Sequence, residues 1–104
     1  MKETEWLARF ASALKRSDIE GAAGLFAEEC YWRDLVAFTW NIVTFEDRSA
    51  IAEMLRVRLA DVRPGSFRPA ERDGWFTFET SLGRGTGHVR VKDGKAWTLF
   101  TALM

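Results

Sequence analysis

The stretch Cys30-Tyr-Trp-Arg-Asp34-Leu-Val-Ala-Phe38-Thr-Trp40-Asn-Ile-Val-Thr44 decides the fold of this chain. Aromatic and β-branched residues alternate with period two over residues 31–35 and again over 38–43, which predicts two strands. One carboxylate, Asp34, lies inside this apolar run. A carboxylate in such a place must be hydrogen-bonded, ion-paired or functional. The stretch therefore predicts paired strands facing a core and names one candidate site residue.

Three helices are predicted around this stretch. Apolar residues at three- and four-residue spacing predict a helix over residues 3–15. The motif Ser17-Asp-Ile-Glu20 matches a capping box, with Ser17 as N-cap of a short second helix that stops near residues 27–29. A third helix is predicted over residues 47–62. Arg63-Pro-Gly65 ends it, because proline cannot continue a helix.

The second half of the chain is predicted to be β structure, with strands over residues 67–71, 75–82, 87–92 and 96–103. Asp-Gly pairs at 73–74 and 93–94 favour hairpin turns. The segment Gly83-Arg-Gly-Thr-Gly87 precedes a strand, whereas a phosphate-binding glycine loop opens a helix, so a hairpin loop or bulge is expected. The order α-α-β-β-α-β-β-β-β predicts an α+β fold, with three helices from the N-terminal half packed on one curved antiparallel sheet.

Composition limits the classes of function. A chain of 104 residues forms a single domain, residues 1–104, and its 15 basic and 15 acidic residues argue against nucleic-acid or membrane partners. No apolar run approaches the roughly 20 residues that span a bilayer. The acidic N-terminus is unlike a signal peptide, and the single Cys30 permits no internal disulfide. We therefore expect a cytoplasmic protein in which Cys30 is a small buried hydrophobe.

The element order resembles the NTF2-like superfamily, which includes the SnoaL-like polyketide cyclases and the ketosteroid isomerases. The likeness is carried by the capping box, by Ala-Ala-Gly-Leu-Phe-Ala-Glu-Glu-Cys30, and by a strand that ends in Asp34. Residues 31–40 and Asp93-Gly-Lys-Ala-Trp-Thr-Leu99 resemble the NTF2-like domain that precedes the FAD- and NADPH-binding domains of some flavin-containing monooxygenases. The resemblance implies a cone closed by helices. Nothing in the chain resembles a dinucleotide fold, so no cofactor is expected.

Asp34 is the first candidate for chemistry. By alternation it shares one strand face with Trp32, whereas Tyr31, Arg33 and Leu35 share the other. In ketosteroid isomerases an aspartate at the matching position is the general base, and an apolar pocket suits that role because it raises the pKa of a carboxyl group. The alternative is structural, with Asp34 accepting backbone N–H bonds at the strand end or pairing with an arginine.

The sequence departs from the isomerase pattern at the groups that hold the enolate. Phe10 occupies the first-helix position of a tyrosine donor, and residues 85–92 contain no carboxylate. An oxyanion hole is therefore not evident. His88, the single histidine, is either a surface or partly buried residue or a general acid opposite Asp34, as SnoaL-like cyclases pair His with Asp.

Several apolar side chains are candidates to line a pocket for a flat hydrophobic molecule, although an ordinary aromatic core is favoured for any single one of them: Trp32, Trp40, Phe78, Trp97 and Leu99. The last strand is apolar on both faces, with Trp97 and Leu99 against Ala96 and Phe100. The helices cover one face, so a homodimer through the other is expected. No metal site is expected, because the adjacent acids at 28–29 and 46–47 diverge.

Two functions follow from these patterns. The first is a pocket-bearing, non-catalytic accessory or dimerisation module related to the flavin monooxygenase domain. The second is a small acid–base enzyme (cyclase, isomerase or dehydratase) that acts on a hydrophobic carbonyl compound with Asp34 as base. The missing oxyanion donors favour the first, and the sequence leaves catalysis open.

Overall fold

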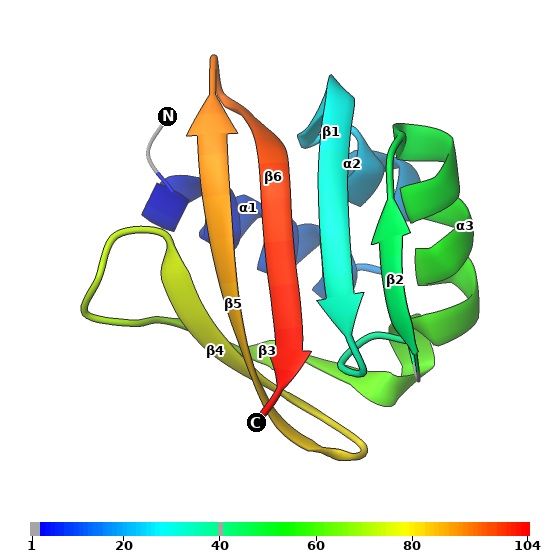
Figure 1. Cartoon of the computed structure of the whole chain (residues 1–104), viewed down its shortest axis with the longest axis vertical. Helices are drawn as coiled ribbons and strands as arrows, with labels where there is room; N and C mark the ends of the chain where they lie inside the picture. Colours follow the sequence, from blue (N-terminus) through cyan, green and yellow to red (C-terminus); the bar gives the residue numbers. More distant parts are fainter. Residues whose placement is uncertain (1–2, 40) are drawn as a thin grey trace.

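The computed structural model describes residues 3–39 and 41–104. Six strands form one sheet in the order β2-β1-β6-β5-β4-β3, and the helices cover one of its faces (Figure 1). The elements are α1 Glu3–Lys15, α2 Ile19–Ala23, β1 Phe26–Leu35, β2 Ile42–Phe45, α3 Arg48–Arg58, the 3₁₀ turn η1 Leu59–Asp61, β3 Val62–Pro69, β4 Trp75–Thr80, β5 Gly83–Lys92 and β6 Lys95–Leu103. Neighbouring strands are antiparallel except β1 and β6, which are parallel.

The predicted element order is confirmed, and α1 has the predicted bounds. Its buried side includes Trp6, Phe10 and Leu14, and the helix packs on β3. The short α2 begins differently from the prediction. Ser17 has a left-handed φ of 54°, and Asp18 is the N-cap, with its carboxylate accepting the Gly21 N–H at 2.9 Å. Ser17 and Glu20 therefore do not form the expected capping box.

Strand boundaries differ from the predictions where the chain turns. β1 begins at Phe26, so residues predicted to end the second helix already belong to the sheet. Residues 36–39 lie outside the strands, and the second strand starts only at Ile42. α3 ends at Arg58, and Pro64 lies inside β3, where the pairing with β4 shifts register between Arg63 and Arg68. A register shift accommodates a proline because no ladder bond is required of it there.

The glycine-rich segment lies in β5 rather than in a hairpin loop. Gly85 and Gly87 pair with Phe78 and Phe76 of β4. A Cβ at Gly85 would lie 2.5 Å from the Phe78 ring, and one at Gly87 would lie 2.3 Å from the Phe76 ring. The glycines therefore make room for the two rings that lie over the strand.

The core lies between the helices and the inner face of the sheet. Aromatic rings fill it in mutual contact. Trp32 stacks on Phe26 at a centroid distance of 5.7 Å, and the edge of Phe10 meets Trp32 at 5.9 Å. Phe67 stacks on Phe78 at 5.1 Å. Rings packed at these distances leave the cone occupied by the protein's own side chains.

Candidate functional site

Asp34 lies near the end of β1 on the inner face and is fully buried. Its carboxylate accepts the Phe38 N–H at 3.0 Å and the Thr39 N–H at 2.6 Å. The Thr39 hydroxyl lies 2.8 Å from the second carboxylate oxygen. The chain turns at Val36, whose φ is 65°, so the following loop folds back over the strand end. Asp34 therefore holds this loop by side-chain to backbone hydrogen bonds.

A second strand supplies another donor to the same carboxylate. Thr101 of β6 pairs with Asp34 in the sheet, and its hydroxyl donates to Asp34 at 2.5 Å. The same hydroxyl accepts the Trp32 indole N–H at 2.9 Å. Within residues 3–39 and 41–104, no buried side-chain nitrogen or oxygen lacks a hydrogen-bond partner. This arrangement corresponds to the structural alternative for Asp34, with backbone N–H donors at a strand end.

The predicted pocket residues of the inner face meet in the core. Trp32, Phe78 and Leu99 are 0%, 1% and 2% exposed. The Phe38 ring lies 4.8 Å from Trp32 and 5.5 Å from Phe78, so the loop held by Asp34 packs on both. Trp40, the other candidate of this stretch, lies outside the described residues.

His88 lies on the other face of the sheet. Its strand neighbour Val89 is buried, whereas His88 is half-buried with its ring 4.8 Å from the Trp75 ring. Burial lowers the pKa of His88, the Arg90 guanidinium lowers it further, and Glu3 opposes both. The structure therefore does not bring His88 and Asp34 together.

Trp97 also lies on the outer face, because β6 bulges there. Arg90 pairs with Thr98 and Val91 with Ala96, so Trp97 is an extra residue between these pairs. The expected alternation placed Trp97 with Leu99. Instead Ala96 and Leu99 are buried, and Trp97 is 37% exposed. A bulge changes which face a residue occupies, and simple alternation cannot anticipate it.

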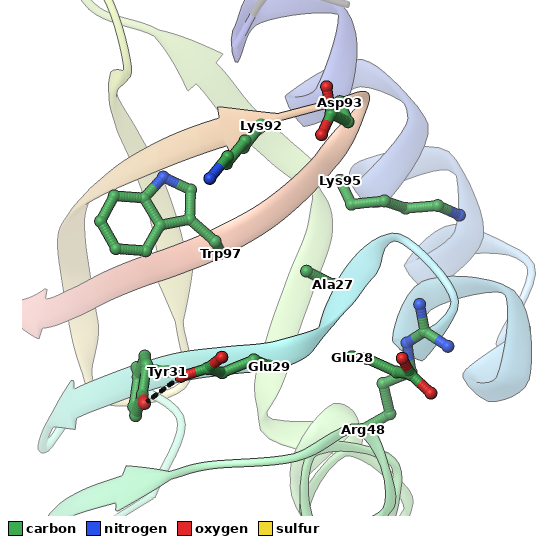
Figure 2. A pocket seen from close by; sticks show the side chains of 9 residues that line it. All are labelled: Ala27, Glu28, Glu29, Tyr31, Arg48, Lys92, Asp93, Lys95 and Trp97. Atoms are coloured by element: carbon green, nitrogen blue, oxygen red, sulfur yellow. Dashed lines mark hydrogen bonds between the residues drawn. The ribbon is translucent and has the colours of Figure 1, made fainter.

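An open groove of about 600 Å³ lies beside Trp97 (Figure 2). Its lining comes from β1, the β5–β6 hairpin and α3: Ala27, Glu28, Glu29, Tyr31, Arg48, Lys92, Asp93, Lys95 and Trp97. The Tyr31 hydroxyl donates to Glu29 at 3.1 Å, and this bond raises the pKa of Tyr31. Sequence reasoning missed the groove, although the run Lys92-Asp-Gly-Lys95 beside Trp97 was a visible signal.

Two cations of the groove also hold the main chain. Arg48 Nε donates to the Phe26 carbonyl at 2.7 Å, and Lys95 Nζ donates to the Gly24 carbonyl at 2.7 Å. The neighbouring Cys30 is fully buried, and burial raises the pKa of its thiol while Arg48 opposes that shift. Cys30 therefore belongs to the core, as expected. Among the described residues, no three His, Cys, Asp or Glu side chains gather as metal ligands would.

Similar proteins were found by structure alone, since no family model and no curated protein matches the sequence. An NTF2-like protein of unknown function from Mesorhizobium loti has a TM-score of 0.69 and 19% identity, covering 98% of this chain and 90% of that one. This chain has the NTF2-like fold.

Two further structures with this fold were determined with ligands. A Mycobacterium tuberculosis protein in complex with estradiol-17beta-hemisuccinate has a TM-score of 0.68 and 12% identity, covering 100% of this chain and 95% of that one. A Catenulispora acidiphila protein with a ketosteroid isomerase-like fold, in complex with trimethylamine, has a TM-score of 0.66 and 13% identity, covering 95% and 85%. At these identities the likeness establishes the NTF2-like fold. Among the described helices of this NTF2-like chain, none has the length and apolarity needed to cross a bilayer.

Proposed function

We propose that this chain is a non-catalytic NTF2-like module that acts by binding through its sheet rather than by chemistry inside its cone. The observation that carries the proposal is the state of Asp34. Its carboxylate is fully buried and accepts hydrogen bonds from Phe38, Thr39 and Thr101. A general base must reach the proton it removes, at about 2.6–3.2 Å or through one water. Asp34 faces the protein's own donors instead.

The acid–base enzyme is the rival hypothesis, and the packing argues against it. Phe10 contributes a ring without a hydrogen-bond donor to the cone and contacts Trp32. The Phe38 ring contacts Trp32 at 4.8 Å, and the Phe38 N–H donates to Asp34. A substrate would have to displace both residues 36–39 and these contacts before it met the carboxylate.

Self-association is the second part of the proposal. The outer face exposes Tyr31 and Trp75, each 38% accessible, and half-buried Phe100 lies between their strands, in register with His88 and Arg33. Aromatic surface of this kind is stabilised by burial against a partner. A second copy that presents the same face would form a symmetric dimer.

The proposed relation to flavin monooxygenases rests on the sequence resemblance of two stretches. Each of the two stretches that resemble their NTF2-like domain contributes lining to one groove, with Tyr31 on β1 and Asp93, Lys95 and Trp97 on the β5–β6 hairpin and β6. An accessory module could use this groove for a hydrophobic small molecule or a neighbouring domain. The buried free thiol of Cys30 agrees with the cytoplasmic location that we propose.

The role of Asp34 can be tested by the substitution Asp34→Asn. An amide nitrogen would meet donors at either oxygen position, so we expect a loss of about 3 kcal/mol in the free energy of unfolding. Urea denaturation measures it, with the exposed Asp73→Asn as matched control. A variant as stable as the wild type would favour the enzyme hypothesis, because a carboxylate kept for catalysis is dispensable for folding.

Dimerisation can be tested by Phe100→Lys. A lysine on the outer face would leave a desolvated charge in the interface, so we expect a monomer in sedimentation velocity at a concentration where the wild type is a dimer. Val57→Lys is the control, because Val57 on α3 is 67% exposed and distant from the sheet face. An unchanged sedimentation coefficient for Phe100→Lys would exclude this interface.

A further inference from the structure

The groove beside Trp97 exists because two neighbouring strands differ in length at that point. β1 and β6 pair at Phe26 with Ala96 and next at Tyr31 with Thr98. Between these two pairs, β1 has four residues, 27–30, whereas β6 has only Trp97. The longer strand bows away from the shorter one and opens the groove of about 600 Å³. That volume lies in the range of pockets that bind small organic molecules, about 300–1,000 Å³.

The groove is lined by charges of both signs. The hairpin wall from β5 and β6 carries Lys92 and Lys95, whereas the opposite wall carries Glu28 and Glu29 of β1, with Arg48 of α3 beside Glu28 (Figure 2). Asp93 lies at the hairpin turn. The Lys92 ammonium has no hydrogen-bond or ion-pair partner within residues 3–39 and 41–104. A ligand that presents opposite polarity at its two ends would match both walls at once.

Between the charged walls the groove offers apolar surface. The Trp97 ring is 37% exposed and borders the space that Lys92 also faces (Figure 2). Ala27 lies between the walls, and its single methyl group leaves room above it. A flat ring system could lie over Ala27 against the indole, since exposed tryptophan faces favour stacking with planar groups.

We propose that this groove binds a planar aromatic carboxylate that carries a hydroxyl group at the opposite end of its ring system. Its carboxylate pairs with Lys92, because that ammonium is without a protein partner. Its rings lie against Trp97, and its hydroxyl donates to the carboxylate of Glu29 beside Tyr31. The volume accommodates two or three fused rings.

This site is separate from the cone, because Tyr31 and Trp97 project from the face opposite Asp34. The inference deepens the proposed function, on which it rests for the binding role of the outer face, and names the class of ligand for that groove. A ligand in the groove would leave the hydrogen bonds of Asp34 untouched. A catalytic Asp34 would equally leave the groove in place.

The test uses 6-hydroxy-2-naphthoate as probe in isothermal titration calorimetry with the full chain. Two comparison compounds each lack one polar end: 2-naphthoate lacks the hydroxyl and 2-naphthol lacks the carboxylate. Lys92→Met removes the ammonium but keeps most of the stem, and the exposed Lys15→Met on α1 is the matched control. Trp97→Leu tests the stacking surface.

We expect 6-hydroxy-2-naphthoate to bind more tightly than either comparison compound. Lys92→Met should lower the affinity for 6-hydroxy-2-naphthoate and 2-naphthoate about tenfold or more and leave the affinity for 2-naphthol unchanged. Trp97→Leu should lower the affinity for all three compounds. Absence of heat with every probe would overturn the proposal, as would equal affinity of Lys92→Met and Lys15→Met. A shift in oligomeric state on Lys92→Met without any probe would overturn it too, because a second copy would then fill the groove.

Discussion

The two faces of the sheet use the same strands for opposite purposes. On β1, Trp32 and Asp34 point inward and are fully buried, whereas Tyr31 and Arg33 point outward and are exposed. On the inner face the buried polar groups are hydrogen-bonded within the protein, and aromatic rings fill the space between the sheet and the helices. The outer face leaves aromatic surface and at least one ammonium, that of Lys92, without partners among the described residues. This difference is the basis of our proposal that the inner carboxylate stabilises the fold and that binding takes place on the outer face.

Gly87→Ala is expected to have the largest effect, because it disturbs the packing on the inner face of the sheet. A Cβ there would meet the Phe76 ring at 2.3 Å and the Phe100 carbonyl at 2.7 Å, and neither can move without disturbing the sheet. We expect a loss of about 3 kcal/mol in the free energy of unfolding, measured by urea denaturation.

Gly65→Ala is the matched control, because a Cβ at Gly65 has no atom within 4 Å. Its stability should equal or slightly exceed that of the wild type, since alanine restricts the unfolded chain. Equal stabilities for the two alanine variants would contradict the close packing of β4 on β5.

Thr101→Val removes the hydroxyl that joins Trp32 to Asp34 while keeping the shape of the side chain. The indole N–H would lose its acceptor and Asp34 would lose a donor, so we expect a loss of about 2 kcal/mol. Thr98→Val on the same strand is the control, because its half-exposed side chain lies on the outer face. A smaller loss for Thr101→Val than for Thr98→Val would show that this network does not stabilise the cone.

The smallest expected effect is the pH dependence of stability that arises from His88 on the outer face. Burial and Arg90 lower its pKa, so the folded protein favours the neutral ring. The unfolded chain binds a proton more readily, so the stabilising contribution is complete above pH 6.5 and is lost as the pH falls through the folded pKa. Proton NMR of the single histidine should give a midpoint below 6.5, and Arg90→Gln should raise it.

Arg84→Gln is the control for that titration, since Arg84 lies near the other end of β5. A wild-type midpoint at or above 6.5 would mean that His88 is more exposed than the packing with Trp75 implies. If Arg90→Gln left the titration midpoint of His88 unchanged, the Arg90 charge would not contribute to the lowered pKa of His88.

Local patterns in the sequence predicted much of the fold. Helical spacing placed α1 at its observed bounds, and alternation placed Trp32 and Asp34 on one face of β1. These features depend on residues close together in the chain. The N-cap was missed because Ser17 and Asp18 are both good caps, and only the left-handed backbone at Ser17 decides between them.

The sites depended on contacts between distant residues, which one sequence does not specify. Thr101 lies 67 positions from Asp34, so its hydrogen bond could not be anticipated, whereas the position of Asp34 at a strand end is consistent with backbone donors. The bulge that turns Trp97 outward arises from the register between β5 and β6. The glycines at 85 and 87 could be recognised as unlike a phosphate loop, but the phenylalanines above them could not.

The central claim is that Asp34 closes the cone by holding residues 36–39 over the strand end, and amide hydrogen exchange tests it most directly. We predict that the Phe38 and Thr39 amides are strongly protected in the native wild type and that Asp34→Asn removes this protection. The exposed Asp73 amide serves as the internal reference for an open loop. Exchange of the Phe38 and Thr39 amides at the rate of Asp73 in the wild type would contradict the account, because the carboxylate would then face an open chamber.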